Sequence, residues 1–230
     1  MIFGGLQKLT LLDYAGKVAC IVFTKGCNFC CPFCHNSSLI NGSEGENISS
    51  DYIIEYLKKR KGILEGVCIT GGEPLLHKEI EDFMREVKSM GYSVKLDTNG
   101  SNPERLKQLV REGLVDYVAM DIKNSYDKYS LTAGCDRVDM RAIEESIDFL
   151  LSGEVDYEFR TTVVKELHTP EDIEQIAKRI EGAKRYFLQN FLDSGAVVCE
   201  NLSPQDADTL GKMLISAQRF VKTAQIRGQS

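Results

Sequence analysis

Three cysteines within eight residues are the part of this sequence best suited to chemistry. Cys27, Cys31 and Cys34 have the spacing Cys-x3-Cys-x2-Cys, in a loop that follows an apolar strand. Three thiolates can hold three irons of a [4Fe–4S] cluster and leave the fourth iron without a protein ligand. A structural zinc site is the alternative, but zinc usually takes four ligands from two well-separated pairs. Cys30 lies in the same loop, and we infer that it is not a ligand because the other three cysteines give the better spacing.

The composition is that of an ordinary globular protein. The chain has 230 residues, 43% of them hydrophobic and 27% charged, which is enough to bury a substantial core. Its net charge of -6 disfavours nucleic-acid binding, which needs a basic surface. No apolar run approaches the roughly 20 residues of a membrane span, and residues 1–6 lack the charged start of a signal peptide. We expect a cytoplasmic protein without nucleic-acid or membrane partners.

Apolar strand-like segments alternate with amphipathic helices along the chain. The expected strands are residues 18–24, 67–70, 93–97, 117–121, 157–164 and 185–189. Three helix starts show a capping residue followed by proline, at Asn102, Thr169 and Ser203. Repeated β/α units without a linker predict one α/β domain with a parallel sheet.

Polar motifs at the strand ends favour a barrel over an open sheet. The successive motifs are the cysteine loop, Gly71-Gly72-Glu73-Pro74, Asp97-Thr98-Asn99-Gly100, Asp121-Ile122-Lys123 and Arg160. A β/α barrel gathers its site at the carboxyl ends of many strands, whereas an open sheet uses one switch point. Side-chain alternation also places charged residues on the inner face: Lys95, Asp97, Asp121, Glu158 and Arg160. We therefore predict a partial (β/α)6 TIM-type barrel of parallel strands, with a C-terminal helix at about 203–222.

Taken together, these motifs resemble a known family. The cysteine motif, with Phe33 before its last cysteine, and the Gly-Gly-Glu-Pro segment resemble the radical S-adenosylmethionine (SAM) superfamily. Asp97-Thr98-Asn99-Gly100 and Asp121-Ile122-Lys123 resemble its glycyl radical enzyme activating enzymes. Residues 10–14 (Thr-Leu-Leu-Asp-Tyr) and 188–191 (Leu-Gln-Asn-Phe) are similar to anaerobic ribonucleoside-triphosphate reductase activating proteins in particular. The resemblance implies a single radical SAM domain over residues 1–230, with its core at about 6–192.

The resemblance implies a radical SAM oxidoreductase that works anaerobically. One [4Fe–4S] cluster would cleave SAM reductively, and the resulting 5′-deoxyadenosyl radical would abstract hydrogen from a glycine of a partner enzyme. The favoured partner is an anaerobic ribonucleotide reductase, with a flavodoxin or ferredoxin as electron donor. Larger activating enzymes insert a further cluster domain before the Gly-Gly-Glu segment, but residues 35–70 contain no second cysteine motif here, so one cluster is expected.

The resemblance also implies roles for individual residues. Phe33 would present an apolar face to adenine, and Gly71 and Gly72 would let the backbone approach the methionyl amino group, with Glu73 stabilising that turn. Further cofactor contacts would come from Asp97, Asn99, Asp121 and Lys123. Arg160 would meet the carboxylate or ribose of SAM and, with the three ligand cysteines, would belong to the catalytic set. Some relatives hold a monovalent cation, for which Asp97, Thr98 and Asp121 are the candidates.

Three other functions stay open at this point. The chain could activate another glycyl radical enzyme of the pyruvate formate-lyase type, although residues 188–193 lack the histidine that those activating enzymes carry. It could use the same radical chemistry on a small molecule or an RNA base. The non-enzymatic alternative is an interaction module stapled by zinc.

Overall fold

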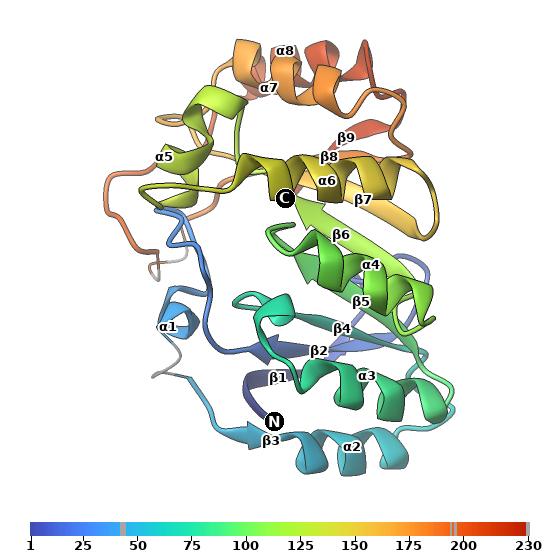
Figure 1. Cartoon of the computed structure of the whole chain (residues 1–230). Helices are drawn as coiled ribbons and strands as arrows, with labels where there is room; N and C mark the ends of the chain where they lie inside the picture. The colour runs from blue at the N-terminus through green and yellow to red at the C-terminus, as the bar shows by residue number, and fades with distance from the viewer. Residues whose placement is uncertain (42–44, 194, 196, 229–230) are drawn as a thin grey trace.

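A curved sheet forms the centre of the molecule, which is described here by a computed structural model for residues 1–41, 45–193, 195 and 197–228 (Figure 1). In this part of the chain the sheet has nine strands in the order β3-β1-β2-β4-β5-β6-β7-β8-β9. The strands are β1 (Ile2–Thr10), β2 (Ala19–Thr24), β3 (Ile48–Ser49), β4 (Gly66–Gly71), β5 (Ser93–Thr98), β6 (Tyr117–Asp121), β7 (Asp156–Val163), β8 (Tyr186–Asn190) and β9 (Ala224–Arg227). All neighbours from β2 to β9 are parallel, whereas β1 is antiparallel to both β2 and β3.

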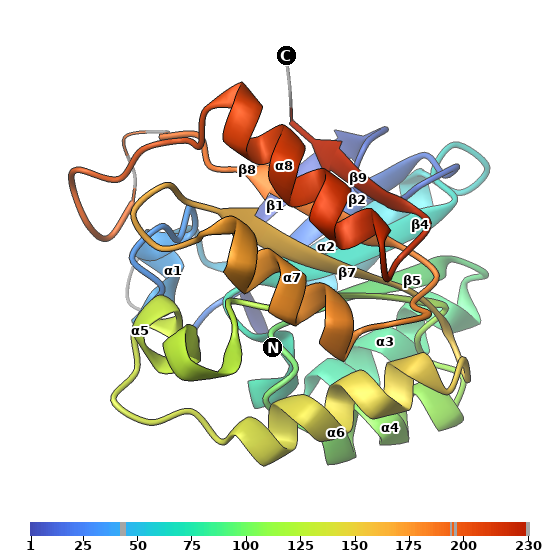
Figure 2. The same ribbon diagram turned by 90° about the horizontal axis from the view of Figure 1, so that it is seen from above.

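Helices cover the outer face of this curved sheet, as the two perpendicular views show (Figures 1 and 2). The long helices are α2 (Ser50–Lys59), α3 (Ile80–Ser89), α4 (Pro103–Arg111), α6 (Met140–Leu151), α7 (Pro170–Arg179) and α8 (Ala207–Gln218). The short helices are α1 (Ser37–Ile40), α5 (Tyr129–Ala133) and the 3-10 turns η1 (Pro74–Leu76) and η2 (Tyr126–Lys128). Among the described residues, no helix combines the length and the apolar character that crossing a membrane requires.

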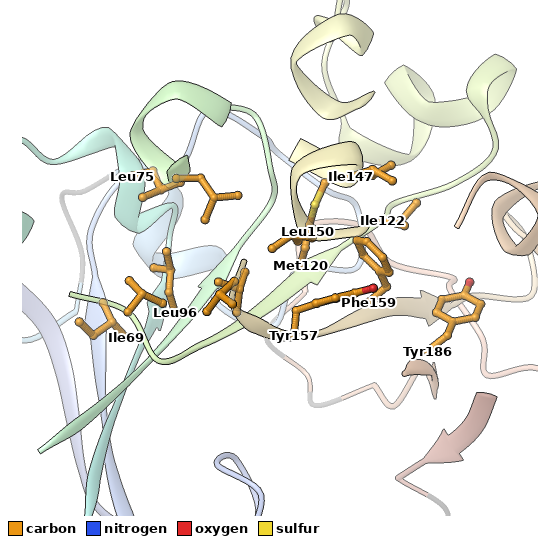
Figure 3. Packing of buried hydrophobic residues seen from close by; sticks show 14 of the residues in the cluster. Ile69, Leu75, Leu96, Met120, Ile122, Ile147, Leu150, Tyr157, Phe159 and Tyr186 are labelled. Atoms are coloured by element: carbon orange, nitrogen blue, oxygen red, sulfur yellow. The ribbon is translucent and has the colours of Figure 1, made fainter. Parts of the chain in front are cut away.

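The outward side chains of the parallel strands form the main core. Ile69, Leu96, Met120 and Phe159 come from four consecutive strands and are fully buried. Figure 3 shows them in a row beneath the helices, with Leu150 of α6 packed over Met120. Burial of such apolar surface stabilises the fold by about 25 cal/mol per Å2, and it is the main force that holds the helices on the sheet.

The predicted fold class is confirmed, and the structure adds strands to it. The six predicted strands correspond to β2 and to β4 through β8. Strands β1, β3 and β9 were not expected, because β1 contains two glycines and no regular alternation, while β3 and β9 are short. These segments become strands because β1 pairs with β2, β3 pairs with β1 and β9 pairs with β8, and the sequence pattern does not reveal these pairings.

One of the three predicted helix starts is wrong. Asn102 and Thr169 accept backbone N–H bonds as N-caps of α4 and α7, as expected. Ser203 instead pairs its carbonyl with the Lys165 N–H at 3.0 Å, and Pro204 forms a β-bridge with Val164. The C-terminal helix therefore spans Ala207–Gln218 instead of 203–222.

The cap of α7 gives a first testable expectation. The Thr169 side chain accepts from the Asp172 N–H, and the Asp172 side chain accepts from the Thr169 N–H in return, which makes a complete capping box. The substitution Thr169→Ala should therefore lower the free energy of unfolding by about 1 kcal/mol. Urea unfolding followed by circular dichroism measures this, and an unchanged midpoint would show that the cap contributes nothing.

Candidate active site

A cavity of about 400 Å³ opens at the carboxyl ends of the parallel strands. All thirteen sequence-predicted site residues line it: Cys27, Cys31, Phe33, Cys34, Gly71, Gly72, Glu73, Asp97, Thr98, Asn99, Asp121, Lys123 and Arg160. Cys30 is not among the lining residues and is exposed. A larger groove of about 530 Å³ lies outside the barrel along α4 and α6, but it contains none of these residues.

The cysteine loop is held in place mainly through its backbone. Gly26 N–H donates to the Leu39 carbonyl at 2.7 Å, and Cys27 N–H donates to the Ile40 carbonyl at 3.1 Å. Phe29, Cys31 and Phe33 alternate with exposed or partly exposed neighbours and are buried. This alternation turns Cys31 towards the cavity and Cys30 away from it, so the two neighbouring cysteines have different surroundings.

The three cysteines of the loop that line the cavity suit a ligand that carries positive charge. Burial raises the pKa of Cys27 to about 12 and that of Cys31 to about 11, although the nearby Lys123 ammonium lowers the pKa of both thiols. Burial also raises the pKa of Cys34. The bare thiols are therefore protonated at neutral pH. Iron bound at the sulfur atoms would supply the charge that stabilises the thiolates, so the donor set fits a [4Fe–4S] cluster with three protein ligands.

The Gly-Gly segment packs directly against the start of the cysteine loop. Gly72 N–H donates to the Thr24 carbonyl at 2.9 Å, and Glu73 N–H donates to the Gly26 carbonyl at 2.8 Å. A Cβ on Gly71 would lie 2.4 Å from the Thr24 nitrogen, and a Cβ on Gly72 would lie 1.9 Å from the Gly26 oxygen. Gly71 also has a φ of 109°. Protein backbone occupies the space that a side chain would need at both positions. Glycine is therefore required here for packing, in addition to any approach of a ligand.

Glu73 connects the ends of two strands. Its buried carboxylate accepts from the Leu75 N–H at 3.0 Å, the Thr98 hydroxyl at 2.8 Å and the Asn99 N–H at 2.7 Å. Burial raises the pKa of Glu73 to about 7, while these three donors oppose the shift. The Asn99 side-chain amide in turn donates to the Asn28 side-chain oxygen at 2.9 Å. Glu73 thus ties the Gly-Gly segment to β5, and Asn99 ties β5 to the cysteine loop.

Charged side chains from β5, β6, β7 and the loop after β6 form a continuous array. Arg160 Nε donates to Asp121 at 2.8 Å, and Arg160 Nη1 donates to Asp97 at 3.0 Å. Lys95 pairs with Asp97, and Lys123 pairs with Asp121 at 3.2 Å. Burial opposes ionisation of the carboxylates, but Arg160 and Lys123 outweigh it and lower the pKa of Asp121 to about 2. The cavity therefore offers fixed charges of both signs, which suits a zwitterionic ligand.

Glu158 is not part of this array. Glu158 and Arg160 share the inner face of β7, but Glu158 accepts two bonds from Arg227 of β9, at 2.7 and 2.9 Å. Tyr117 donates a third at 2.8 Å. Arg160 instead donates to Asp97 and Asp121 at the strand ends.

Comparison with known proteins decides the family. A profile of the radical SAM superfamily matches residues 21–180, which is more than half of the chain and includes all thirteen site residues. The chain belongs to the radical SAM superfamily. Membership implies a [4Fe–4S] cluster and SAM as cofactors. It argues against the non-enzymatic alternative, an interaction module stapled by zinc.

Several radical SAM proteins are similar to this chain. A protein of Methanocaldococcus jannaschii, named as a glycyl-radical enzyme activating enzyme, is 36% identical over 196 residues, which are 81% of this chain and 78% of that protein. The pyruvate formate-lyase-activating enzyme of Clostridium pasteurianum is 28% identical over 127 residues, which are 53% of this chain and 52% of that enzyme. Streptococcus suis SuiB bound to its precursor peptide SuiA has a TM-score of 0.71 at 14% identity, over 90% of this chain and 48% of SuiB. This last likeness shows the shared fold.

Sequence reasoning missed some residues of the radical SAM cavity. Gln7, Asp13, Thr162 and Gln189 also line it. The alternation of side chains does place Thr162 on the same face as Arg160, two positions earlier on that strand, but it gave Thr162 no role in the site. Gln7 could not be placed in this way, because β1 was not predicted as a strand.

Proposed function

We propose that this radical SAM protein activates a partner enzyme by generating a radical on one of its glycines, and that the partner is an anaerobic ribonucleoside-triphosphate reductase. When bound, the cluster and SAM supply an organic radical that abstracts hydrogen. The observation that carries the proposal is the placement of the three loop thiols and the Asp97–Arg160–Asp121–Lys123 array in one cavity.

The chain's own residues would bind and orient the two cofactors. Cys27, Cys31 and Cys34 would each ligate one iron as thiolates. Arg160 or Lys123 would pair with the carboxylate of SAM, and Asp121 or Asp97 would pair with its ammonium group. Each such pairing would replace part of an existing ion pair in the array, so no buried charge would lose its partner.

Apolar side chains would limit water at the reacting atoms. Phe33 lies in the cavity wall between the two last ligand cysteines, where it can present a face to adenine. Ile21, Phe23 and Phe29 extend the apolar part of the wall. A dry site strengthens the ionic contacts to the cofactor and protects an organic radical from side reactions.

Two sequence segments support the reductase as partner. Residues 10–14 and 188–191 carry the resemblance to reductase activating proteins, and one residue of each, Asp13 and Gln189, lines the cavity. The absence of histidine from residues 188–193 disfavours a pyruvate formate-lyase partner. A small reducing protein such as a flavodoxin or ferredoxin would supply the electron.

The monovalent cation is a further part of the proposal. Asp97 and Asp121 already share Arg160, and the Thr98 hydroxyl donates to Glu73. A cation on these three residues would therefore take over part of the charge compensation that Arg160 provides.

The test is an anaerobic activation assay with the reconstituted protein, SAM and a chemical reductant. The candidate partners are an anaerobic ribonucleotide reductase and a pyruvate formate-lyase, each with a matched variant in which the target glycine is alanine. We expect a glycyl radical doublet in electron paramagnetic resonance with the reductase and its loss in the alanine variant. A doublet with the lyase alone would overturn the choice of partner. SAM cleavage with no doublet from either would favour a small-molecule or RNA substrate.

A further inference from the structure

A buried hydroxyl beside the cysteine loop has no acceptor for its proton. Tyr129, the first residue of α5, is 1% exposed. In the described part of the chain, its hydroxyl is one of two buried side-chain polar atoms without a partner, the other being Arg105 Nε. Arg105 still donates through Nη2 to the His77 and Lys78 carbonyls. The Tyr129 hydroxyl therefore has no acceptor for its proton, and a buried donor without an acceptor destabilises the fold.

Helix α5 packs directly against the cysteine loop, and both views show it beside the segment that precedes α1 (Figures 1 and 2). Cys30 N–H donates to the Ala133 carbonyl at 2.9 Å. Cys135 Sγ donates to the Asn28 carbonyl at 3.2 Å. Gly134, which ends α5 in the left-handed conformation, leaves no room for a Cβ, because that atom would lie 1.9 Å from the Cys30 oxygen. The helix and the loop are thus fixed relative to each other.

One titratable neighbour of the hydroxyl is an acceptor that receives no hydrogen bond. Burial raises the pKa of Tyr129, and the neighbours that act on it include Lys123, Cys31 and Asp121. The Lys123 ammonium and backbone N–H are donors and cannot take the hydroxyl proton. Asp121 already accepts from Arg160 and Lys123. No hydrogen bond of the described residues ends on Cys31 Sγ. Cys27 Sγ, by contrast, accepts from the Phe29 N–H at 3.4 Å and from the Asn99 side-chain amide at 4.0 Å.

We propose that Tyr129 donates a hydrogen bond to Cys31 Sγ when Cys31 is an iron ligand. The inference rests on the cluster of the proposed function and adds a residue to it. A thiol is a weak acceptor, but an iron-bound thiolate is a stronger one, so the bond would form with the cluster. Cys31 and Lys123 line the cavity, whereas Tyr129 does not. Tyr129 is therefore a positioning residue.

Such a bond should make the cluster easier to reduce. A donor on a ligand sulfur withdraws negative charge from the cluster, which favours the reduced state. The variant Tyr129→Phe keeps the ring and removes only the hydroxyl. We expect the equilibrium constant for one-electron reduction of its cluster to fall by about two- to tenfold. This corresponds to a decrease of at most about 59 mV in the reduction potential. An anaerobic redox titration without SAM, followed by electron paramagnetic resonance, measures this independently of activity.

Tyr92→Phe is the matched control, because the two variants should differ in both the urea midpoint and the reduction potential. Tyr92 is also buried, but its hydroxyl donates to the Leu57 carbonyl at 2.8 Å, at the opposite ends of the strands from the cysteine loop. Tyr92→Phe should lower the urea midpoint of the cluster-free protein and leave the potential unchanged. Tyr129→Phe should leave that midpoint unchanged or raise it, because it removes an unpaired buried group.

Iron and sulfide analysis separates the possible failures. A Tyr129→Phe protein with wild-type iron and sulfide content and an unchanged potential would overturn the inference. So would a well-folded variant that no longer binds the cluster, since one hydrogen bond does not decide whether three thiolates hold iron. Absence of iron and sulfide from the wild-type protein after reconstitution would instead overturn the proposed function.

Discussion

Replacement of Cys31 by alanine should abolish cluster binding, whereas the same replacement of Cys30, one position earlier, should leave it intact. Cys31 is buried and lines the cavity with Cys27 and Cys34, while Cys30 is exposed and lies outside the cavity lining. We expect bound iron and sulfide to fall by at least roughly tenfold in Cys31→Ala, because the variant leaves the cluster with two protein thiolates instead of three.

The comparison is sharp because the two variants differ only in position. The backbone contact of Cys30, from its N–H to the Ala133 carbonyl, does not involve the side chain and survives in Cys30→Ala. Circular dichroism of both cluster-free variants controls for folding. Equal iron loss in Cys30→Ala and Cys31→Ala would contradict the ligand set Cys27, Cys31 and Cys34, and it would place Cys30 in the site.

Gly72→Ala should damage both folding and cluster binding. Its Cβ would lie 1.9 Å from the Gly26 carbonyl oxygen, and that atom is backbone, so no side-chain rotation relieves the clash. The Gly72 and Glu73 N–H groups bond to the Thr24 and Gly26 carbonyls, so the segments cannot separate without losing these bonds. We expect a loss of about 2–3 kcal/mol in the free energy of unfolding. Because Gly26 precedes Cys27, iron binding should fall as well.

Gly211→Ala provides the matched control. Gly211 lies within α8, and a Cβ there would meet no atom within 4 Å. The same substitution should stabilise the protein by about 0.5–1 kcal/mol, because alanine favours the helix. Urea unfolding of the cluster-free proteins and iron analysis after reconstitution measure both effects. A Gly72→Ala protein with wild-type stability and iron content would show that β4 and the cysteine loop can move apart freely.

Helix caps show where local sequence signals succeed and where they fail. Thr169-Pro170 and Ser203-Pro204 carry the same cap signature, yet only the first begins a helix. The capping box of α7 uses residues within four positions of each other, so the sequence contains all its partners. Residues 203–204 instead pair with 164–165, and that contact exists only after the chain has folded.

The family could be predicted from the amino-acid sequence alone, through the cysteine spacing and the order of polar motifs along the strands. Parallel strands bring their carboxyl ends to one edge, so motifs at those ends were bound to meet in one cavity. Only the tertiary structure decided which groups pair there. Glu158 bonds to Arg227 and not to Arg160, and backbone fills the space at Gly71 and Gly72. The buried Tyr129 hydroxyl has no acceptor for its proton. These contacts join segments that are distant in the chain, and their partners depend on packing in three dimensions, which no local spacing encodes.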